Sequence, residues 1–345
     1  MADTKINGAL FQSMVTEGAL AITEQKEQIN ELNVFPVPDG DTGTNMSMTM
    51  TAAMNELAKL SEPTLAKAAD TTASALLRGA RGNSGVILSL LFRGMAKKLR
   101  ETEAANGRDL ALALREGVDT AYKAVMKPAE GTILTVSRVA AQKTVEQCQA
   151  DDSLSAEQVL AAIVEHGRAA LAETVHQNPV LEKAGVVDAG GFGFITILEG
   201  MLDAMRGIHK ERTGRAAGQG GGELRGDFAT RTFTFTYCTE FIAERKDKAR
   251  NVGRLRAILN DIGDSLVVVE DDDIVKVHVH TDQPNKALEE GLKFGPLLTV
   301  KIENMREQHT AKVIEGTADT PKERVIVPAE KKYGFVAVAA GEGLK

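Results

Sequence analysis

The sequence contains no tryptophan, and aromatic residues make up only 4% of its 345 residues. A core without large rings must be built from aliphatic and methionine side chains, which favours packed helices over a β-sandwich. Only two cysteines occur, Cys148 and Cys238. Two cysteines do not make a disulfide framework, so we expect both to stay reduced.

Basic residues are also in the minority, since the formal net charge is −7. The chain therefore lacks the positive surface with which nonspecific nucleic-acid binders neutralise phosphates. The N-terminus has no apolar signal segment, and no run of about 18 apolar residues occurs. We expect no nucleic-acid partner, no transmembrane segment and a cytoplasmic location.

Residues 5–208 show the apolar periodicity of amphipathic helices with short polar breaks. The pattern predicts eight helices, at about 5–29, 44–60, 64–80, 84–101, 108–127, 132–149, 155–177 and 190–208. We therefore predict an all-α domain over residues 1–208. A polar, glycine-rich stretch at 209–226 cannot bury a core and is the predicted linker.

Beyond the linker the apolar pattern changes from helical to alternating. It predicts a strand at 232–239, a helix at 246–262, strands at 265–270 and 274–280, a helix at 284–294 and a strand at 297–303. This βαββαβ order indicates a ferredoxin-like α+β domain over residues 227–327. Residues 328–345 resemble the first strand and glycine turn of a further domain, so we expect the chain to stop at the start of that domain.

The segment 38–45 reads Pro-Asp-Gly-Asp-Thr-Gly-Thr-Asn and places two carboxylates, Asp39 and Asp41, before a predicted helix. Mg²⁺ is commonly held by one or two carboxylates together with substrate phosphates. Backbone N–H groups of a glycine loop at a helix N-terminus suit those phosphates. The alternative is an acidic turn that only caps a helix. A calcium loop counted from Asp39 is excluded, because Thr44 replaces its invariant glycine and Met50 its final glutamate.

Three further glycine-rich segments, 78–86, 130–135 and 185–193, open predicted helices. In the first of them, Asn83 and Ser84 can either cap the helix or bind a phosphate. The chain has no Walker A sequence, and Val86 replaces the second glycine of a nucleophile elbow. Several glycine-opened helices in one all-α domain exceed what tight connections require, which favours phosphate binding.

Four motifs in this order resemble the ATP-binding subunit of dihydroxyacetone kinase, the DhaL-like family: Asp-Gly-Asp-Thr-Gly-Thr-Asn-Met at 39–46, Arg-Gly-Asn-Ser-Gly at 81–85, Gly-Thr-Ile-Leu at 131–134 and Asp-Ala-Gly-Gly at 188–191. The resemblance covers residues 5–208 and implies an eight-helix barrel with ATP or ADP at one end. It implies that Asp39 and Asp41 hold the catalytic Mg²⁺. The family usually offers another Asp shortly before this pair, and the nearest candidate for that ligand here is Asn33.

The resemblance also implies nucleotide contacts, with the phosphates near 44–46 and 82–84 and the nucleoside near Asp188. The implied cofactor-binding residues are Thr42, Gly43, Thr44, Asn45, Met46, Gly82, Asn83, Ser84, Gly131, Thr132, Asp188 and Gly190.

The segment Leu-Asn-Val-Phe-Pro-Val-Pro at 32–38 and the attached second domain resemble the bacterial fatty acid kinase A subunit still more closely. In that family a DegV-like fatty-acid-binding protein presents an acyl chain, whose carboxylate is phosphorylated to an acyl phosphate. The resemblance implies an ATP- and Mg²⁺-dependent phosphotransferase with that carrier as partner, and it is compatible with a homodimer. Because a carboxylate is already ionised near pH 7, we assign no general base.

A second metal site is predicted in the α+β domain. His278 and His280 lie two apart on the predicted third strand and share one face, while Cys238 lies on the first strand. First and third strands are adjacent in a ferredoxin-like sheet, so the three side chains can form a Zn²⁺ site with one open position. The alternative is a half-buried cysteine beside two surface histidines. The resemblance to the fatty acid kinase A subunit supports zinc.

Two other functions stay open at this point. The chain can be a dihydroxyacetone-type kinase of a small hydroxy compound, although such a protein would end near residue 208. It can also be a non-enzymatic, metal-dependent scaffold or regulator whose glycine loops only cap helices. Binding of Mg²⁺ and nucleotide separates the last reading from the two kinases.

Overall fold

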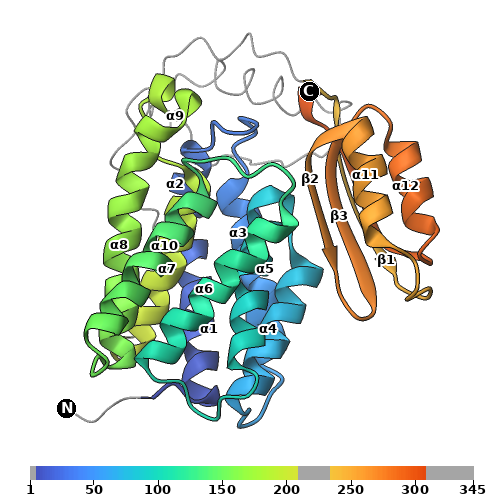
Figure 1. Ribbon diagram of the computed structural model, residues 1–345. Helices are drawn as coiled ribbons and strands as arrows, with labels where there is room; N and C mark the ends of the chain where they lie inside the picture. Colours follow the sequence, from blue (N-terminus) through green and yellow to red (C-terminus); the bar gives the residue numbers. More distant parts are fainter. Residues whose placement is uncertain (1–4, 209–233, 308–345) are drawn as a thin grey trace, which may run out of the picture.

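The computed structural model of the protein describes residues 5–208 and 234–307 (Figure 1). The predicted linker 209–226 and the predicted start of a further domain at 328–345 lie outside the described residues. So do the two ends of the predicted second domain, 227–233 and 308–327. The domain boundaries given above therefore stay predictions.

The first described part is entirely helical. Its elements are α1 (Gly8–Glu24), α2 (Lys26–Glu31), α3 (Thr42–Leu57), α4 (Leu65–Gly79), α5 (Gly82–Leu99), α6 (Gly107–Ala124), α7 (Ile133–Ala150), α8 (Ala156–Gln177), α9 (Pro179–Ala184) and α10 (Ala189–Met205). Each of the eight long helices packs against the next one along the chain, and α10 packs against α1. The long helices therefore close a ring around one apolar core.

The helix predicted at 5–29 is wrong in one respect, because the structure divides this segment into α1 and α2 at Gln25. The break lets α2 dock on the start of α3. The Asn30 side chain accepts a hydrogen bond from Thr44 N–H at 3.1 Å and donates one to Thr44 Oγ1 at 3.0 Å. A Cβ at Gly43 would lie 2.1 Å from the Lys26 carbonyl oxygen, so only glycine permits this approach.

Helix α9 lies in a segment for which no helix was predicted. Its start and end nevertheless follow ordinary rules: Pro179 occupies the first turn, the Asn178 side chain accepts from Val180 N–H, and Gly185 ends the helix with φ +67°. A six-residue helix shows too little apolar periodicity to stand out beside the glycine motif that follows it.

The second described part has the order β1 (Tyr237–Glu244), α11 (Val252–Ile262), β2 (Gly263–Glu270), β3 (Ile274–Thr281), α12 (Pro284–Leu292) and β4 (Leu297–Asn304). The four strands form one antiparallel sheet in the order β2-β3-β1-β4. The predicted βαββαβ order and the adjacency of the first and third strands are confirmed.

Two bounds in this part differ from the prediction. Strand β1 continues to Glu244 because its pairing with β3 runs to Ile274, and residues 232–233 of the predicted strand lie outside the described part. Helix α11 begins at Val252 instead of 246, since the Asn251 side chain caps it by accepting from Gly253 N–H.

Both faces of this sheet are covered. Alternate residues such as Phe241, Val268 and Val277 form a core with α11 and α12. The opposite set, including Ile242, Val267, Val269 and Ile274, belongs to the core of the helical ring. Figure 1 accordingly shows the sheet beside the ring, with α11 and α12 on its outer side. The face that carries the predicted zinc ligands is therefore buried against the helical domain.

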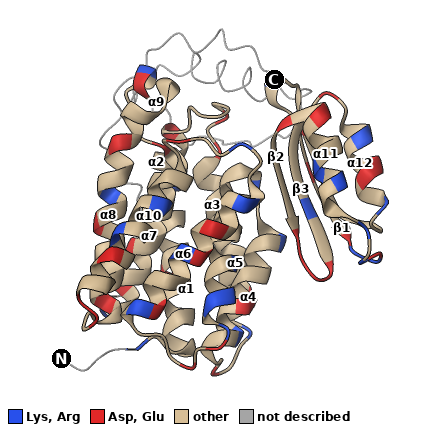
Figure 2. Ribbon diagram, in the orientation of Figure 1, with Lys and Arg blue, Asp and Glu red and all other residues tan. Residues whose placement is uncertain are grey.

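Polar contacts add to this junction between the domains. Arg93 on α5 forms a 3.1 Å ion pair with Asp271 in the β2–β3 turn, and Val125 forms a β-bridge with Val267. In Figure 2, acidic and basic residues are interspersed along the helices and strands. Within the described ranges, no helix has both the length and the apolar character required to cross a membrane.

Candidate functional site

A narrow polar pocket of about 40 Å³ lies where the sheet meets one end of the helical ring. It brings together three features that the sequence analysis considered separately: the acidic loop, the glycine loop before α5, and the cysteine–histidine group of the sheet. Its predicted site residues are Asn33, Asp39, Asp41, Thr42, Asn45, Gly82, Asn83, Ser84, Cys238, His278 and His280. We call this space the polar pocket.

The acidic loop forms the first wall. Gly40 has φ +57°, which turns the chain between Asp39 and Asp41. Asp41 is the N-cap residue of α3, but its side chain makes no capping hydrogen bond. A carboxylate at a helix start that is not used as a cap faces the pocket instead. This observation weighs against the reading of the loop as a mere capping turn.

Asn33 lies beside this loop and is buried. Its Oδ1 accepts hydrogen bonds from the N–H and the hydroxyl of Thr42, while its Nδ2 donates to the Val37 carbonyl at 2.6 Å. Asn33 thus fixes the two ends of the acidic loop against each other. Its role as a third metal ligand stays a prediction.

The glycine loop before α5 forms the second wall. Arg81 is the N-cap residue and gives no side-chain cap, so neither Asn83 nor Ser84, both in the first turn, serves as the cap. Gly82 has φ +58°, and a Cβ there would lie 2.6 Å from Asn45 Nδ2. Glycine is required at this position because it brings the two loops into contact.

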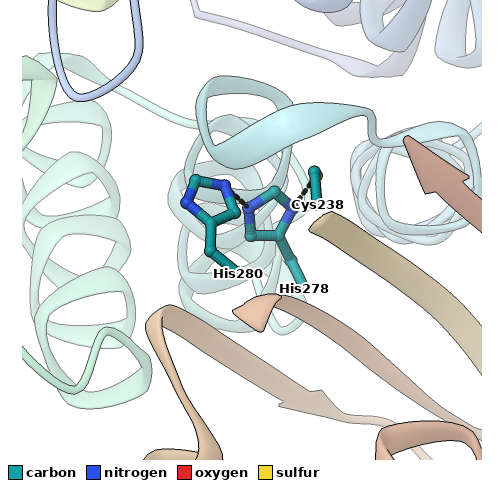
Figure 3. A group of neighbouring side chains, drawn as sticks. All are labelled: Cys238, His278 and His280. Atoms are coloured by element: carbon teal, nitrogen blue, oxygen red, sulfur yellow. Dashed lines mark hydrogen bonds between the residues drawn. The ribbon is translucent and has the colours of Figure 1, made fainter. Parts of the chain in front are cut away.

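The third wall is the sheet, where Cys238 on β1 and His278 and His280 on β3 point toward one another (Figure 3). One candidate ligand atom from each lies within 4.8 Å of the others. The two Nε2 atoms are 3.3 Å apart, which is roughly the separation of two nitrogens on a tetrahedral zinc with Zn–N bonds of about 2.0–2.1 Å. Both histidines are buried, so the alternative of surface histidines is wrong.

Glu240 completes this group. It lies opposite His278 in the β1–β3 register, and its Oε1 is 2.6 Å from His278 Nδ1. Zinc-bound histidines commonly donate their second ring N–H to a carboxylate, which fixes the ring. Glu240 occupies that position relative to His278, with His278 Nε2 directed toward His280.

The electrostatics of the group suit a cation. Burial lowers the pKa of His278, but the charges and hydrogen bonds of Cys238 and Glu240 outweigh burial and raise it to about 10. Burial, helped by His278, lowers the pKa of His280 to about 3. One proton is therefore shared by a site with several lone pairs, and a metal ion can take the place of that proton.

A second cavity of about 290 Å³ adjoins the polar pocket and is mainly apolar. The two spaces share Thr42, Asn83 and Ser84. Of the other predicted residues, Thr132, Asp188 and Gly190 line this apolar cavity. Its remaining wall comes from the sheet domain, through residues 264–267 of β2 and Asn260 of α11.

Asp188 opens α10 as its N-cap, and its Oδ2 accepts from Gly191 N–H at 2.7 Å. Burial raises the pKa of this carboxyl to about 7, although hydrogen bonds from the Gly191 and Ile133 backbones oppose the shift. Asp188 therefore changes charge near neutral pH at the wall of the apolar cavity.

Four predicted contact residues line neither space: Gly43, Thr44, Met46 and Gly131. The first two hold α2 against α3, as described above. Met46 is fully buried and packs beside Gly193, and Gly131 adopts φ +70° in the turn before α7. The structure gives these residues positions in the supports of the two loops.

Sequence reasoning missed three contributions to the site. Glu240 and Lys276 were not selected, and neither was the sheet-domain wall of the apolar cavity. Strand alternation could have identified Glu240, because it shares a face with Cys238. No local pattern announces that a strand face will meet a loop of another domain.

Comparison with known families matches residues 36–203 to the DAK2 domain. It matches residues 234–312 to the middle domain of the FakA-like family, the fatty acid kinases. The described helical ring is thus a DAK2 domain. The chain belongs to the family that joins this domain to a FakA-like middle domain, which confirms the resemblance predicted from its motifs.

Similar proteins are longer than this chain. Protein YloV of Bacillus subtilis (strain 168) is 38% identical over 353 aligned residues, covering 100% of this chain and 63% of the relative. An uncharacterized Staphylococcus aureus protein, SAB1090 of strain bovine RF122 / ET3-1, is 38% identical over 358 residues, covering 99% of this chain and 62% of the relative. The chain therefore spans less than two thirds of either relative.

A solved structure with weaker similarity is the native form of the dihydroxyacetone kinase of C. freundii. It has 21% sequence identity and a TM-score of 0.42, covering 59% of this chain and 36% of that one.

Proposed function

We propose that this chain is the ATP- and Mg²⁺-dependent component of a fatty acid kinase, which phosphorylates the carboxylate of an acyl chain presented by a DegV-like carrier protein. The observation that carries the proposal is the polar pocket. There the acidic loop, the glycine loop before α5 and the Cys238/His278/His280 group face one another. The family matches of both domains support the same activity.

The two adjoining spaces divide the nucleotide between them. The apolar cavity suits the base and sugar, with Thr132, Asp188 and Gly190 on its wall. The polar pocket suits the phosphates, because Asn83 and Ser84 lie in the first turn of α5, where free N–H groups attract anions. Asp39 and Asp41, with Asn33 beside them, would hold Mg²⁺, which neutralises phosphate charge during transfer.

The Cys238, His278 and His280 side chains would hold Zn²⁺, leaving one coordination position open. Since all three line the same pocket as the acidic loop, an acceptor carboxylate can lie between the two metal sites. The protein itself supplies position and charge, and a carboxylate acceptor needs no general base. This arrangement favours the acyl acceptor over a small hydroxy compound.

The architecture fits the same proposal. The ring of eight long helices corresponds to the eight-helix barrel implied by the DhaL-like resemblance, and the strand order β2-β3-β1-β4 corresponds to a ferredoxin-like sheet. We place the linker at 209–226 and the middle domain at 227–327, with residues 328–345 beginning a further domain.

The test is phosphoryl transfer by the purified protein, with MgATP and a fatty-acid-loaded DegV-like protein. We expect an acyl phosphate, trapped by hydroxylamine as a hydroxamate, only when the carrier is present. Asp41→Ala should abolish the product and weaken MgADP binding by at least about tenfold in isothermal titration, because one of the two carboxylates for the metal is removed.

The melting temperature of Asp41→Ala should stay unchanged, since the Asp41 side chain does not cap α3. Asp70→Ala is the matched control, because Asp70 forms only an exposed ion pair with Arg100. Wild-type protein that binds no nucleotide would refute the kinase proposal. Transfer to dihydroxyacetone without a carrier would instead favour the small-substrate kinase.

A further inference from the structure

The sheet domain holds the backbone of the glycine loop that opens α5. Glu240 Oε1 accepts a hydrogen bond from Gly82 N–H at 2.7 Å, and Lys276 Nζ donates one to the Ala80 carbonyl at 2.5 Å. Both side chains are buried, with 7% of Glu240 and 3% of Lys276 exposed. Two groups of opposite charge from one domain thus grip two nearby peptide groups of the other.

The same oxygen of Glu240 also accepts from His278 Nδ1 at 2.6 Å. One carboxylate oxygen therefore connects Gly82, in a loop of the polar pocket, with a member of the Cys238/His278/His280 group. The sheet fixes this link, because Glu240 and His278 lie directly opposite each other in the β1–β3 register.

We infer that Glu240 is a positioning residue that couples metal binding at Cys238, His278 and His280 to nucleotide binding at the glycine loop. The inference rests on the proposed nucleotide and metal sites. When His278 binds a metal through Nε2, its Nδ1–H is directed to Glu240. The orientation of the Glu240 carboxylate is then fixed, and so is the Gly82 peptide that it holds.

The coupling should be favourable in sign. Glu240 is an anion on the wall of the pocket proposed for phosphates, and an uncompensated anion there repels them. A divalent cation at the neighbouring group offsets that charge. A loop that is already fixed also loses less conformational freedom when the nucleotide binds. Linkage requires the nucleotide to strengthen metal binding by the same factor.

The experiment measures both affinities in the whole protein. MgADP is titrated calorimetrically into metal-stripped protein and into protein reloaded with Zn²⁺, and Zn²⁺ affinity is measured by chelator competition with and without MgADP. We expect MgADP to bind at least about fivefold tighter when zinc is present, with an equal factor for zinc.

Glu240→Ala should reduce this factor to less than about twofold, with zinc kept saturating because its affinity should fall about 10–100-fold. Glu244→Ala is the control on the same strand, since its side chain forms only a 3.5 Å ion pair with Lys246. It should keep the full factor. A Glu240→Ala protein with an undiminished factor would show that the coupling does not pass through Glu240.

Hydrogen exchange of the wild-type protein gives a second measurement that does not depend on any variant. Zinc should slow exchange in the peptide 80–86, which contains the Gly82 amide, and leave the α9 peptide unchanged. Binding of both ligands with no mutual effect and no protection of this peptide overturns the coupling alone. Failure to bind either ligand overturns the proposed function beneath it.

Discussion

Single residues of this protein combine burial with charge to an unusual degree at the junction of its domains. Lys276 is one example: burial lowers its pKa to about 8, and Arg81 adds to this effect, while the nearby Glu240 opposes it. Such groups are retained at a cost in desolvation, so their partners matter more than their number. Here the partners are backbone atoms of the glycine loop.

Asp188 carries a pH prediction at this scale. Its pKa is about 7 in the folded protein and 3.8 in the reference state. Between these values the folded protein holds a proton that the unfolded chain has released. The free energy of unfolding should therefore fall as the pH rises from about 4 to about 7, by up to about 4 kcal/mol from this group.

Asp188→Asn should remove this contribution, because asparagine still caps α10 but does not titrate. Urea unfolding of both proteins at pH 5, 6, 7 and 8 measures the effect. The variant should gain stability relative to wild type as the pH rises. Parallel pH profiles would show that the Asp188 carboxyl has an ordinary pKa.

Residue patterns in the sequence predicted much of the site. Alternation along a strand placed His278 and His280 on one face, and the βαββαβ order placed Cys238 beside them. The link from Glu240 to Gly82 was not predictable in this way. Its partners are 158 residues apart, and their meeting depends on how two finished domains dock.

At the scale of elements, the sequence predicted the long helices better than the short ones. Helices α5 and α6 lie within a few residues of the predicted bounds, because their apolar periodicity extends over 18 residues each. The break at Gln25 has no proline or glycine to signal it. It exists because α2 packs on α3, a tertiary contact that overrides local helix preference.

Strands β1 and β3 carry the metal prediction. Purified protein should contain about one zinc per chain, and His278→Ala/His280→Ala should contain none, because a lone cysteine cannot hold the ion. Metal analysis by mass spectrometry measures this. His166→Ala is the control, since His166 lies on α8 and contacts only the exposed Gln147 side chain. Equal zinc in all three proteins would exclude the site.

At the scale of the whole molecule, apolar packing joins the two domains more than ion pairs do. Val267→Asp should destabilise the protein by about 3 kcal/mol or more, because Val267 is only 2% exposed and belongs to the core shared with the helical ring. Asp271→Ala removes the Arg93 ion pair, which is partly exposed, and should cost less than about 1 kcal/mol.

Calorimetry distinguishes the two variants. Asp271→Ala should unfold like the wild type, whereas Val267→Asp should separate the melting of the sheet domain from that of the helical ring. Equal destabilisation by both substitutions would mean that the shared core contributes little to holding the domains together.

The covered face of the sheet also limits how this protein can be recombined. Glu240 and Lys276 recognise backbone atoms of residues 80–82, whose side chains can vary without disturbing the contact. A chimera between relatives should therefore tolerate exchange of the outer helices α11 and α12. It should lose nucleotide affinity when β1 and β3 are exchanged without the glycine loop that was shaped against them.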